Sequence, residues 1–245
     1  MGIKDRRTRL LLSLQLLGGE NLSEVNADPK FFSYIDLILN ERTKGVISSL
    51  IKEGLIEKTE QGAYKLSEKG FLEIVLKFPF FRFLRKEWDG KWRIISYEIP
   101  EVKRHLRDRL RREMEGWGLG PWHRSFWITP HPIIENLRDL VLGKEEEKYI
   151  QAFEANHSFG DREILINKVW KTKELEKRYK ELFKIWHDIV ASQQDPFLKF
   201  KKITAHYVSL LKIDPGLPKE LVGERWISFE AWDIFKEIKQ LMYKS

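Results

Sequence analysis

Cysteine is absent from the 245 residues of the sequence. Without it the chain has no disulfide framework, no thiolate-bound metal and no thiol nucleophile. Long apolar runs are also missing, because no stretch approaches the roughly 20 residues that a membrane-spanning helix requires. We therefore expect a soluble, cytoplasmic protein with no membrane partner.

Local catalytic motifs are missing as well. There is no glycine-rich phosphate loop of the Walker type and no nucleophile elbow. The six histidines show neither an i, i+4 pair nor an arrangement of neighbouring carboxylates that would specify a metal, so each is interpreted as structural or surface; they are His105, His123, His131, His157, His187 and His206. We expect no enzyme activity, no metal and no cofactor.

The amino-terminal segment has the outline of a secretory signal, because basic residues 4–9 precede a leucine-rich stretch. Ser13 and Gln15 interrupt that stretch, and its leucines follow helical spacing. The pattern predicts an amphipathic helix that ends at Gly18.

The composition is that of a folded protein with a moderate basic surplus. Lys and Arg total 44 against 37 Asp and Glu, which gives a net charge of +7, and aromatic residues make up 13%. This surplus permits an anionic partner but does not by itself indicate one.

Residues 1–84 have the order helix, helix, helix, hairpin. The second helix opens at Asp28-Pro29, the third runs from Glu41 to Glu53 with Asn40 as N-cap, and two short strands flank a turn at residues 60–62. This order is typical of a winged helix-turn-helix.

The third helix of this region has a small, polar face that could enter a DNA major groove. The alternative is an ordinary solvated face. The candidate DNA-binding residues are Arg42, Lys44, Gly45, Ser48, Ser49 and Lys52 on this helix, Lys58, Thr59, Gln61 and Lys65 on the hairpin, and Arg6, Arg7 and Arg9 on the first helix.

From Trp88 the pattern changes to alternating strands and helices. The order β, α, β, α, β predicts a ferredoxin-like sheet if residues 118–129 fold as a hairpin through Gly118-Leu119-Gly120-Pro121. After Gly160 the chain is predicted to be helical. The helix over 102–117 carries the basic face Arg104, Arg107 and Arg111, which could bind phosphate or could pair with acids within the helix, as Asp108 with Arg112 would.

Several motifs resemble the PaaX family of transcriptional regulators. They are Trp88-Asp89-Gly90-Lys91-Trp92-Arg93, Ile99-Pro100-Glu101, the basic run 104–112, Gly116-Trp117-Gly118-Leu119-Gly120, Ser125-Phe126-Trp127-Ile128-Thr129-Pro130, and Asp214-Pro215-Gly216-Leu217-Pro218-Lys219-Glu220-Leu221 with His206 before it and Trp226 after it. The resemblance covers nearly the whole chain in order.

The resemblance implies an α+β, multidomain protein. Its parts would be a winged helix-turn-helix over 1–84, a ferredoxin-like βαββαβ domain over 85–158 that is similar to the small CRISPR-associated nuclease, and a helical domain over 159–245. It also implies a ligand-responsive repressor that binds a palindromic operator in double-stranded DNA as a homodimer. In this family the usual effector is an aryl acyl-coenzyme A thioester.

The alternative function is a metal-dependent nuclease in the central domain. In the CRISPR nuclease an aspartate near the end of the first strand ligates the metal, and Glu98 occupies the comparable place here. A single glutamate per chain supplies few ligands for a metal ion.

Overall fold

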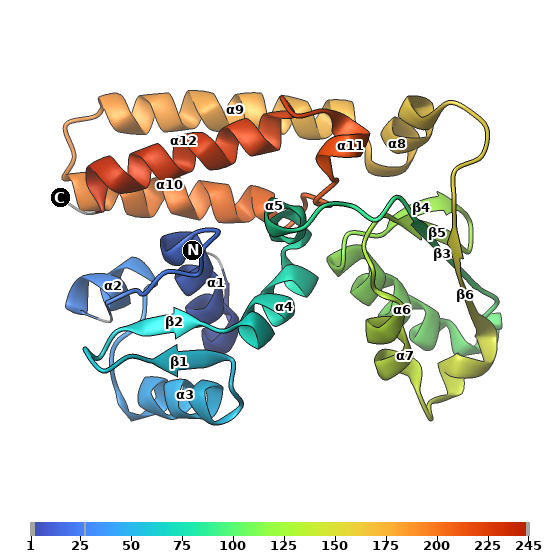
Figure 1. Ribbon diagram of the computed structural model, residues 1–245, viewed down its shortest axis with the longest axis horizontal. Helices are drawn as coiled ribbons and strands as arrows, with labels where there is room; N and C mark the ends of the chain where they lie inside the picture. Colours follow the sequence, from blue (N-terminus) through green and yellow to red (C-terminus); the bar gives the residue numbers. More distant parts are fainter. Residues whose placement is uncertain (1–2, 27, 244–245) are drawn as a thin grey trace. The chain divides into compact units, whose positions relative to one another are not determined.

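The computed structural model describes residues 3–26 and 28–243 of the chain, which divides into two compact units (Figure 1). The first unit comprises Met1–Lys77, Arg178–Lys212 and Ile227–Ser245, and the second comprises Phe78–Lys177 and Ile213–Trp226. Both ends of the chain therefore contribute to the same unit.

The amino-terminal part of the first unit is a winged helix-turn-helix, which confirms the predicted element order. Its elements are α1 (Arg6–Gly18), α2 (Pro29–Tyr34), α3 (Glu41–Lys52), β1 (Ile56–Lys58), β2 (Tyr64–Leu66) and α4 (Glu68–Lys77). The first three helices are capped at their starts. The side chains of Asp5, Asp28 and Asn40 accept hydrogen bonds there from backbone N–H groups. These caps satisfy donors that a helix start would otherwise leave without a partner.

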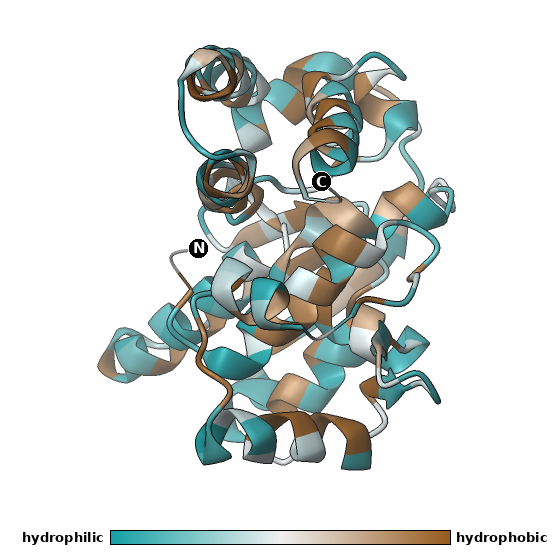
Figure 2. Ribbon diagram, turned by 90° about the vertical axis from the view of Figure 1, so that its left-hand side faces the viewer, coloured by the Kyte–Doolittle hydropathy of each residue, from teal (hydrophilic) through white to brown (hydrophobic). Residues whose placement is uncertain are grey.

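The carboxy-terminal helices complete the core of the first unit. They are α9 (Thr172–Ala191, from Arg178 onward), α10 (Pro196–Leu211) and α12 (Ile227–Met242). Their apolar and polar positions lie on different sides of each helix (Figure 2). Tyr34 of α2 stacks on Phe200 with 5.2 Å between ring centroids, and its hydroxyl donates to Thr204 Oγ1 at 3.1 Å. Aromatic packing thus joins α2 to the carboxy-terminal helices.

The second unit contains a four-stranded antiparallel sheet in the order β4-β5-β3-β6. Its strands are β3 (Trp92–Tyr97), β4 (Gly120–His123), β5 (Phe126–Thr129) and β6 (Ile150–Ala155), and its helices are α6 (Arg104–Gly116) and α7 (Ile134–Val141). The chain order βαββαβ and this strand order define a ferredoxin-like fold, as predicted.

Successive side chains of β3 point to opposite faces of the sheet, and a hydrophobic core lies on each face. Ile95 and Tyr97 pack with Trp127, Leu110 and Met114, the last two from α6. The opposite face carries Trp92 and Ile128 against α8 (Arg162–Trp170). The shorter elements of this unit are the 3₁₀ turns η1 (Pro79–Phe81), η2 (Glu101–Lys103) and η3 (Glu145–Tyr149), and the helices α5 (Arg82–Arg85) and α11 (Lys219–Val222).

The hairpin between β4 and β5 turns at a different place from the one predicted. Gly120 and Pro121 belong to β4, and the turn lies at Arg124-Ser125, where Arg124 has φ of 31°. Gly118 has φ of 84° and no room for a side chain, because a Cβ there would lie 2.6 Å from the carbonyl oxygen of Pro215. Gly118 is therefore required because its backbone lies close to that of Pro215. The turn itself is made by residues other than glycine.

A buried loop at residues 214–218 packs against His131 in the second unit. His131 is fully buried, and its Nε2 donates to the carbonyl oxygen of Pro215 at 2.7 Å. Its ring stacks on Phe83, whereas its buried Nδ1 has no hydrogen-bond partner in the described part of the chain. Burial, together with the nearby positive charges of Arg82 and Arg93, lowers the pKa of His131 to about 3.

Candidate nucleic-acid interface

Helix α3 separates into a buried and an exposed face, as the sequence pattern predicts. Thr43, Ile47 and Leu50 are buried. The predicted DNA-reading side chains Arg42, Lys44, Gly45, Ser48, Ser49 and Lys52 are all exposed. This surface is not covered by any described residue of the first unit, so it is open to a partner.

Two of these exposed residues are engaged within the helix. Lys44 forms an ion pair with Glu41 at 2.9 Å, and Ser49 Oγ donates to Glu53 Oε1 at 2.6 Å. Both pairs lie at the surface, where such interactions are weak and exchange readily with other partners. The exposed face therefore retains its capacity to hydrogen-bond with an incoming ligand.

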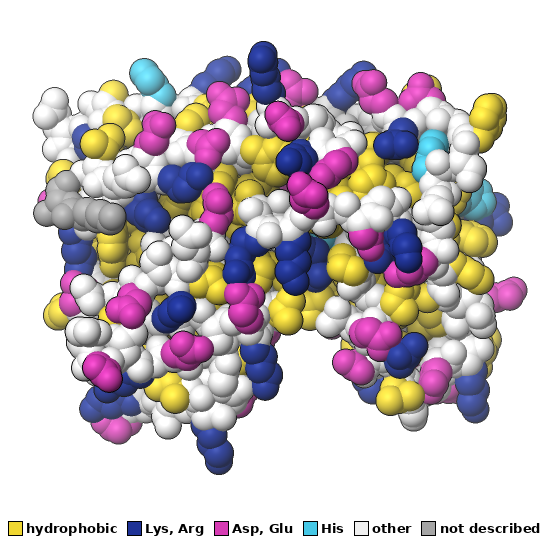
Figure 3. Space-filling view, viewed as in Figure 1, with side chains coloured by type: hydrophobic (Ala, Val, Ile, Leu, Met, Phe, Trp, Pro, Cys, Tyr) yellow, Lys and Arg dark blue, Asp and Glu magenta, His cyan; other side chains and the backbone are white. Residues whose placement is uncertain are grey.

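The hairpin of β1 and β2 places further polar residues at the surface. Lys58 and Gln61 are exposed, and Lys65 and Thr59 are half-buried. Thr59 is used within the turn, since its Oγ1 accepts from the N–H of Ala63 at 3.1 Å. In Figure 3, Lys and Arg side chains project around the end of the unit that carries α3 and this hairpin, with acidic side chains between them.

The three arginines predicted to contact phosphate lie in different environments. Arg6 is exposed. Arg7 forms a bidentate pair with Glu53 at 2.8 and 2.6 Å and also binds Glu73. Arg9 donates to the carbonyl oxygens of Ile35 and Asp36 at 3.2 and 3.0 Å. Arg7 and Arg9 therefore hold the winged helix together in this structure, and only Arg6 projects outward.

Arg7 also changes the electrostatics at the end of α3. Its hydrogen bonds, together with that from Ser49, lower the pKa of Glu53 to about 2. Glu53 therefore stays ionised at any physiological pH, and α1 remains tied to the carboxy-terminal end of α3.

The basic face of α6 is largely neutralised by acidic partners. Arg104 pairs with Asp108 at 3.5 Å, Arg107 with Glu101 at 2.7 Å, and Arg111 with Glu115 at 4.0 Å. This arrangement agrees with the alternative in which the helix carries internal pairs, although Asp108 pairs with Arg104 and not with Arg112.

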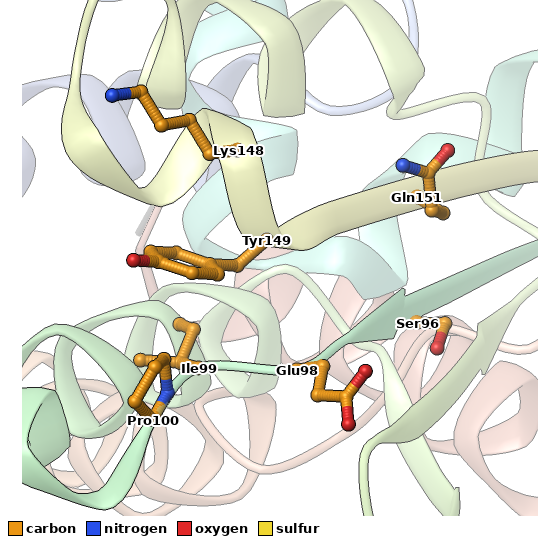
Figure 4. Close-up of a pocket in the computed structure, with 7 residues that line it drawn as sticks. All are labelled: Ser96, Glu98, Ile99, Pro100, Lys148, Tyr149 and Gln151. Atoms are coloured by element: carbon orange, nitrogen blue, oxygen red, sulfur yellow. The ribbon is translucent and has the colours of Figure 1, made fainter.

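Glu98 lies beside a pocket of about 720 Å³ on the second unit. The pocket is lined by Ser96, Glu98, Ile99, Pro100, Lys148, Tyr149 and Gln151, and Figure 4 shows the Glu98 carboxylate directed away from the Lys148 ammonium. Among residues 3–26 and 28–243 no group of three or more His, Asp or Glu could hold a metal ion. The nuclease alternative therefore remains a prediction about a lone carboxylate.

Two exposed aliphatic residues at the start of α3 were not predicted as part of the site. Ile38 is 79% exposed and Leu39 is 50% exposed. Isoleucine and leucine are among the residue types most often buried, so the sequence does not signal that these two side chains are exposed.

The fold and the exposed face of α3 define a winged-helix protein with a ferredoxin-like second module. Sequence models for the "PaaX protein central Cas2-like domain" and the "PaaX-like protein C-terminal domain" match residues 85–164 and 170–245. The chain belongs to the PaaX family of transcriptional regulators.

Among solved structures, the chain is similar to an uncharacterised protein, Rv0674, from Mycobacterium tuberculosis. The two share 18% identity with a TM-score of 0.54 over 97% of each chain, a likeness that concerns the fold. No curated protein sequence matches the chain significantly. In the described part of the chain no helix has the length and apolar character needed to cross a membrane.

Proposed function

We propose that this protein is a ligand-responsive transcriptional repressor that binds a palindromic operator as a homodimer in the cytoplasm. The observation that supports DNA binding most directly is the exposed polar face of α3, which follows a capped helix start and precedes a basic hairpin. Membership in a family of transcriptional regulators supports the same assignment.

The roles within the interface follow from residue chemistry. Arg42, Ser48 and Lys52 present hydrogen-bonding groups to base edges in the major groove. Lys58 and Lys65 of the hairpin, with Arg6, neutralise backbone phosphates, which gives affinity without sequence preference. Arg7 and Arg9 act indirectly by fixing the position of α3.

Selection of bound sequences from a random DNA pool tests this assignment. We expect one palindromic motif to be enriched, and Lys52→Ala or Ser48→Ala to relax the preference at defined positions. Lys58→Ala should weaken binding to all sequences and reduce the slope of log affinity against log salt by about 1. Lys168→Ala, at an exposed lysine of α8, is the matched control and should change neither property.

The proposed dimer makes a separate claim about operator geometry. Two recognition helices related by a two-fold axis contact half-sites whose centres lie about one helical turn, or a multiple of it, apart. Inserting five base pairs between the half-sites should abolish tight binding, whereas inserting ten should restore part of it. Sedimentation of the unliganded protein should give twice the 29.3 kDa chain mass; a monomer that binds both spacings equally would contradict the dimer.

The effector is proposed by family resemblance to be an aryl acyl-coenzyme A thioester. Such a ligand lowers operator affinity only if it binds the DNA-free state more tightly. Titration calorimetry should detect binding of phenylacetyl-coenzyme A, and the thioester should release operator DNA in a gel while free coenzyme A should not. Equal operator affinity with and without each of a panel of aryl thioesters would contradict the proposal that such a thioester is the effector.

A further inference from the structure

The turn between α2 and α3, residues 35–40, is held rigidly by the winged helix. Thr43 Oγ1 donates to the carbonyl oxygen of Ile38 at 2.7 Å, and the N–H of Leu37 donates to the carbonyl oxygen of Phe32 at 3.0 Å. Arg9 donates to the carbonyl oxygens of Ile35 and Asp36. The backbone of the turn is therefore fixed at both ends and in its middle.

The conformation at Asp36 adds to this evidence. Asp36 has φ of 55°, a left-handed conformation that non-glycine residues adopt at a cost, and its carboxylate pairs with Lys201 of α10 at 2.5 Å. The side chain that precedes it, Ile35, is fully buried. After this anchored segment Leu37 is half-buried, and the side chains of Ile38 and Leu39 are exposed.

Ile38 and Leu39 are the aliphatic side chains that this turn presents to solvent. Their exposure forgoes stabilisation that burial of such side chains would contribute. Other exposed aliphatic residues occur on the molecule, including Ile164 on α8. The pair at 38–39 differs from them because it directly precedes Asn40, the N-cap of the helix whose polar face is open, and lies within four residues of Arg42.

The surroundings favour duplex DNA over a protein as the occupant of this surface. The pair directly precedes the exposed face of α3. The exposed Arg42 beside it matches the charge of phosphates, whereas Lys44 is paired with Glu41. The thymine C5-methyl is the apolar group that a major groove displays. A fixed aliphatic side chain beside hydrogen-bonding residues is thus suited to a thymine next to bases that are read through polar contacts.

We propose that Ile38 is a specificity-determining residue that contacts a thymine methyl in each half-site, with Leu39 packing beside it. This inference rests on the proposed function, because it requires α3 to lie in the major groove. It goes further by naming the base and the atom that are recognised.

Removal of single methyl groups from the DNA tests the inference. The motif selected by the wild-type protein is synthesised with each thymine replaced in turn by deoxyuridine, which lacks only the C5-methyl. Wild-type affinity should fall about fourfold at one or two positions per half-site, as expected for one buried methyl group. Ile38→Ala should bind thymine and deoxyuridine equally at those positions and remain sensitive to changes at bases read by Lys52.

Ile164→Ala is the matched control, since it removes a similarly exposed isoleucine outside the winged helix. It should retain the wild-type response to every deoxyuridine. Unchanged urea midpoints for both variants would show that the fold is intact, as expected for exposed side chains.

The outcomes separate this inference from the proposed function. If no motif is selected, the proposed function fails and the inference fails with it. If a motif is selected but Ile38→Ala retains the full deoxyuridine response, the thymine contact alone is wrong. If Ile38→Ala instead converts a dimer to a monomer in sedimentation, the surface is a protein interface and the inference is overturned.

Discussion

At the scale of single residues, Gly45 has no explanation within the protein. A Cβ built at this position would meet nothing within 4 Å, although the residue lies in the middle of α3. Gly70 of α4 is different, because a Cβ there would lie 2.0 Å from the carbonyl oxygen of Leu55. Glycine inside a helix costs about 0.5–1 kcal/mol relative to alanine, so its presence at 45 fits an external surface that approaches closely.

Substitution of Gly45 should therefore separate stability from DNA binding. Gly45→Ala should raise the free energy of unfolding by about 0.5–1 kcal/mol in urea titrations, whereas Gly70→Ala should lower it. Gly45→Leu should keep the fold but reduce operator affinity at least tenfold, because its side chain occupies space needed by the bases. Gly116→Leu, at another exposed helix glycine, serves as the control; a Gly45→Leu protein with normal affinity would contradict the assignment.

His131 makes the free energy of unfolding depend on pH. Its pKa is about 3 when buried in the folded protein and near ~6.5 in the unfolded chain. Between these values the unfolded state binds a proton that the folded state does not. The contribution is therefore fully present above about pH 6.5 and is lost, by up to ~1.4 kcal/mol per pH unit, as the pH falls toward 3.

Urea midpoints measured at pH 7, 6 and 5 check this expectation. The midpoint of the wild-type protein should fall over that range, and that of His131→Gln should fall less because glutamine does not titrate. His187→Gln removes a histidine that is 83% exposed and should leave the wild-type dependence unchanged. Equal pH dependence in all three proteins would show that His131 is not the titrating group.

At the scale of elements, local chemistry predicts the starts of helices better than the turns. Asn40 and Asp28 identify the starts of α3 and α2 because their side chains suit the N-cap. The predicted position of the β4–β5 turn was wrong because Arg124 adopts a positive φ that the sequence does not signal. Gly118 is required instead by its approach to Pro215, and Gly120 by its packing against Val169 and Trp170 of α8. The exposed face of α3 was predictable from periodicity, but the engagement of Arg7 and Arg9 was not, since their partners lie far away in sequence.

The link from α1 to α3 through Arg7 gives an element-scale prediction. Arg7→Ala should lower the urea midpoint and weaken operator binding severalfold, because the end of α3 loses its anchor on Glu53. We expect it to leave the slope of log affinity against log salt unchanged, because the guanidinium of Arg7 is engaged by Glu53 and Glu73. Arg6→Ala should have the opposite pattern, with an unchanged urea midpoint and a salt-dependence slope reduced by about 1. A reduced slope for Arg7→Ala would show that Arg7 contacts phosphate after all.

At the scale of the whole molecule, the first unit is assembled from segments that are distant in sequence. Tyr34 stacks on Phe200, and Glu20 accepts from Trp232 Nε1 at 2.8 Å and pairs with Lys236 at 3.2 Å. The sequence predicts that the chain is helical after Gly160, but it does not say which surface the apolar faces of α10 and α12 would meet. The predicted domain boundaries at residues 84 and 158 divide the chain into consecutive stretches of sequence, and they remain a prediction. In three dimensions, segments from both halves of the chain belong to one compact unit.

This shared core predicts that the winged helix depends on the carboxy-terminal helices for its stability. A fragment of residues 1–84 leaves Tyr34 without Phe200 and Thr204, which forfeits about 1.5–3 kcal/mol for that side chain alone. We expect the fragment to lose its cooperative thermal transition or to melt well below the intact protein in circular dichroism. In the full chain Phe200→Ala should cost about 3–5 kcal/mol and weaken operator binding, whereas Leu198→Ala, at an exposed site of the same helix, should do neither. A fragment that melts like the intact protein would show that the winged helix is stable on its own.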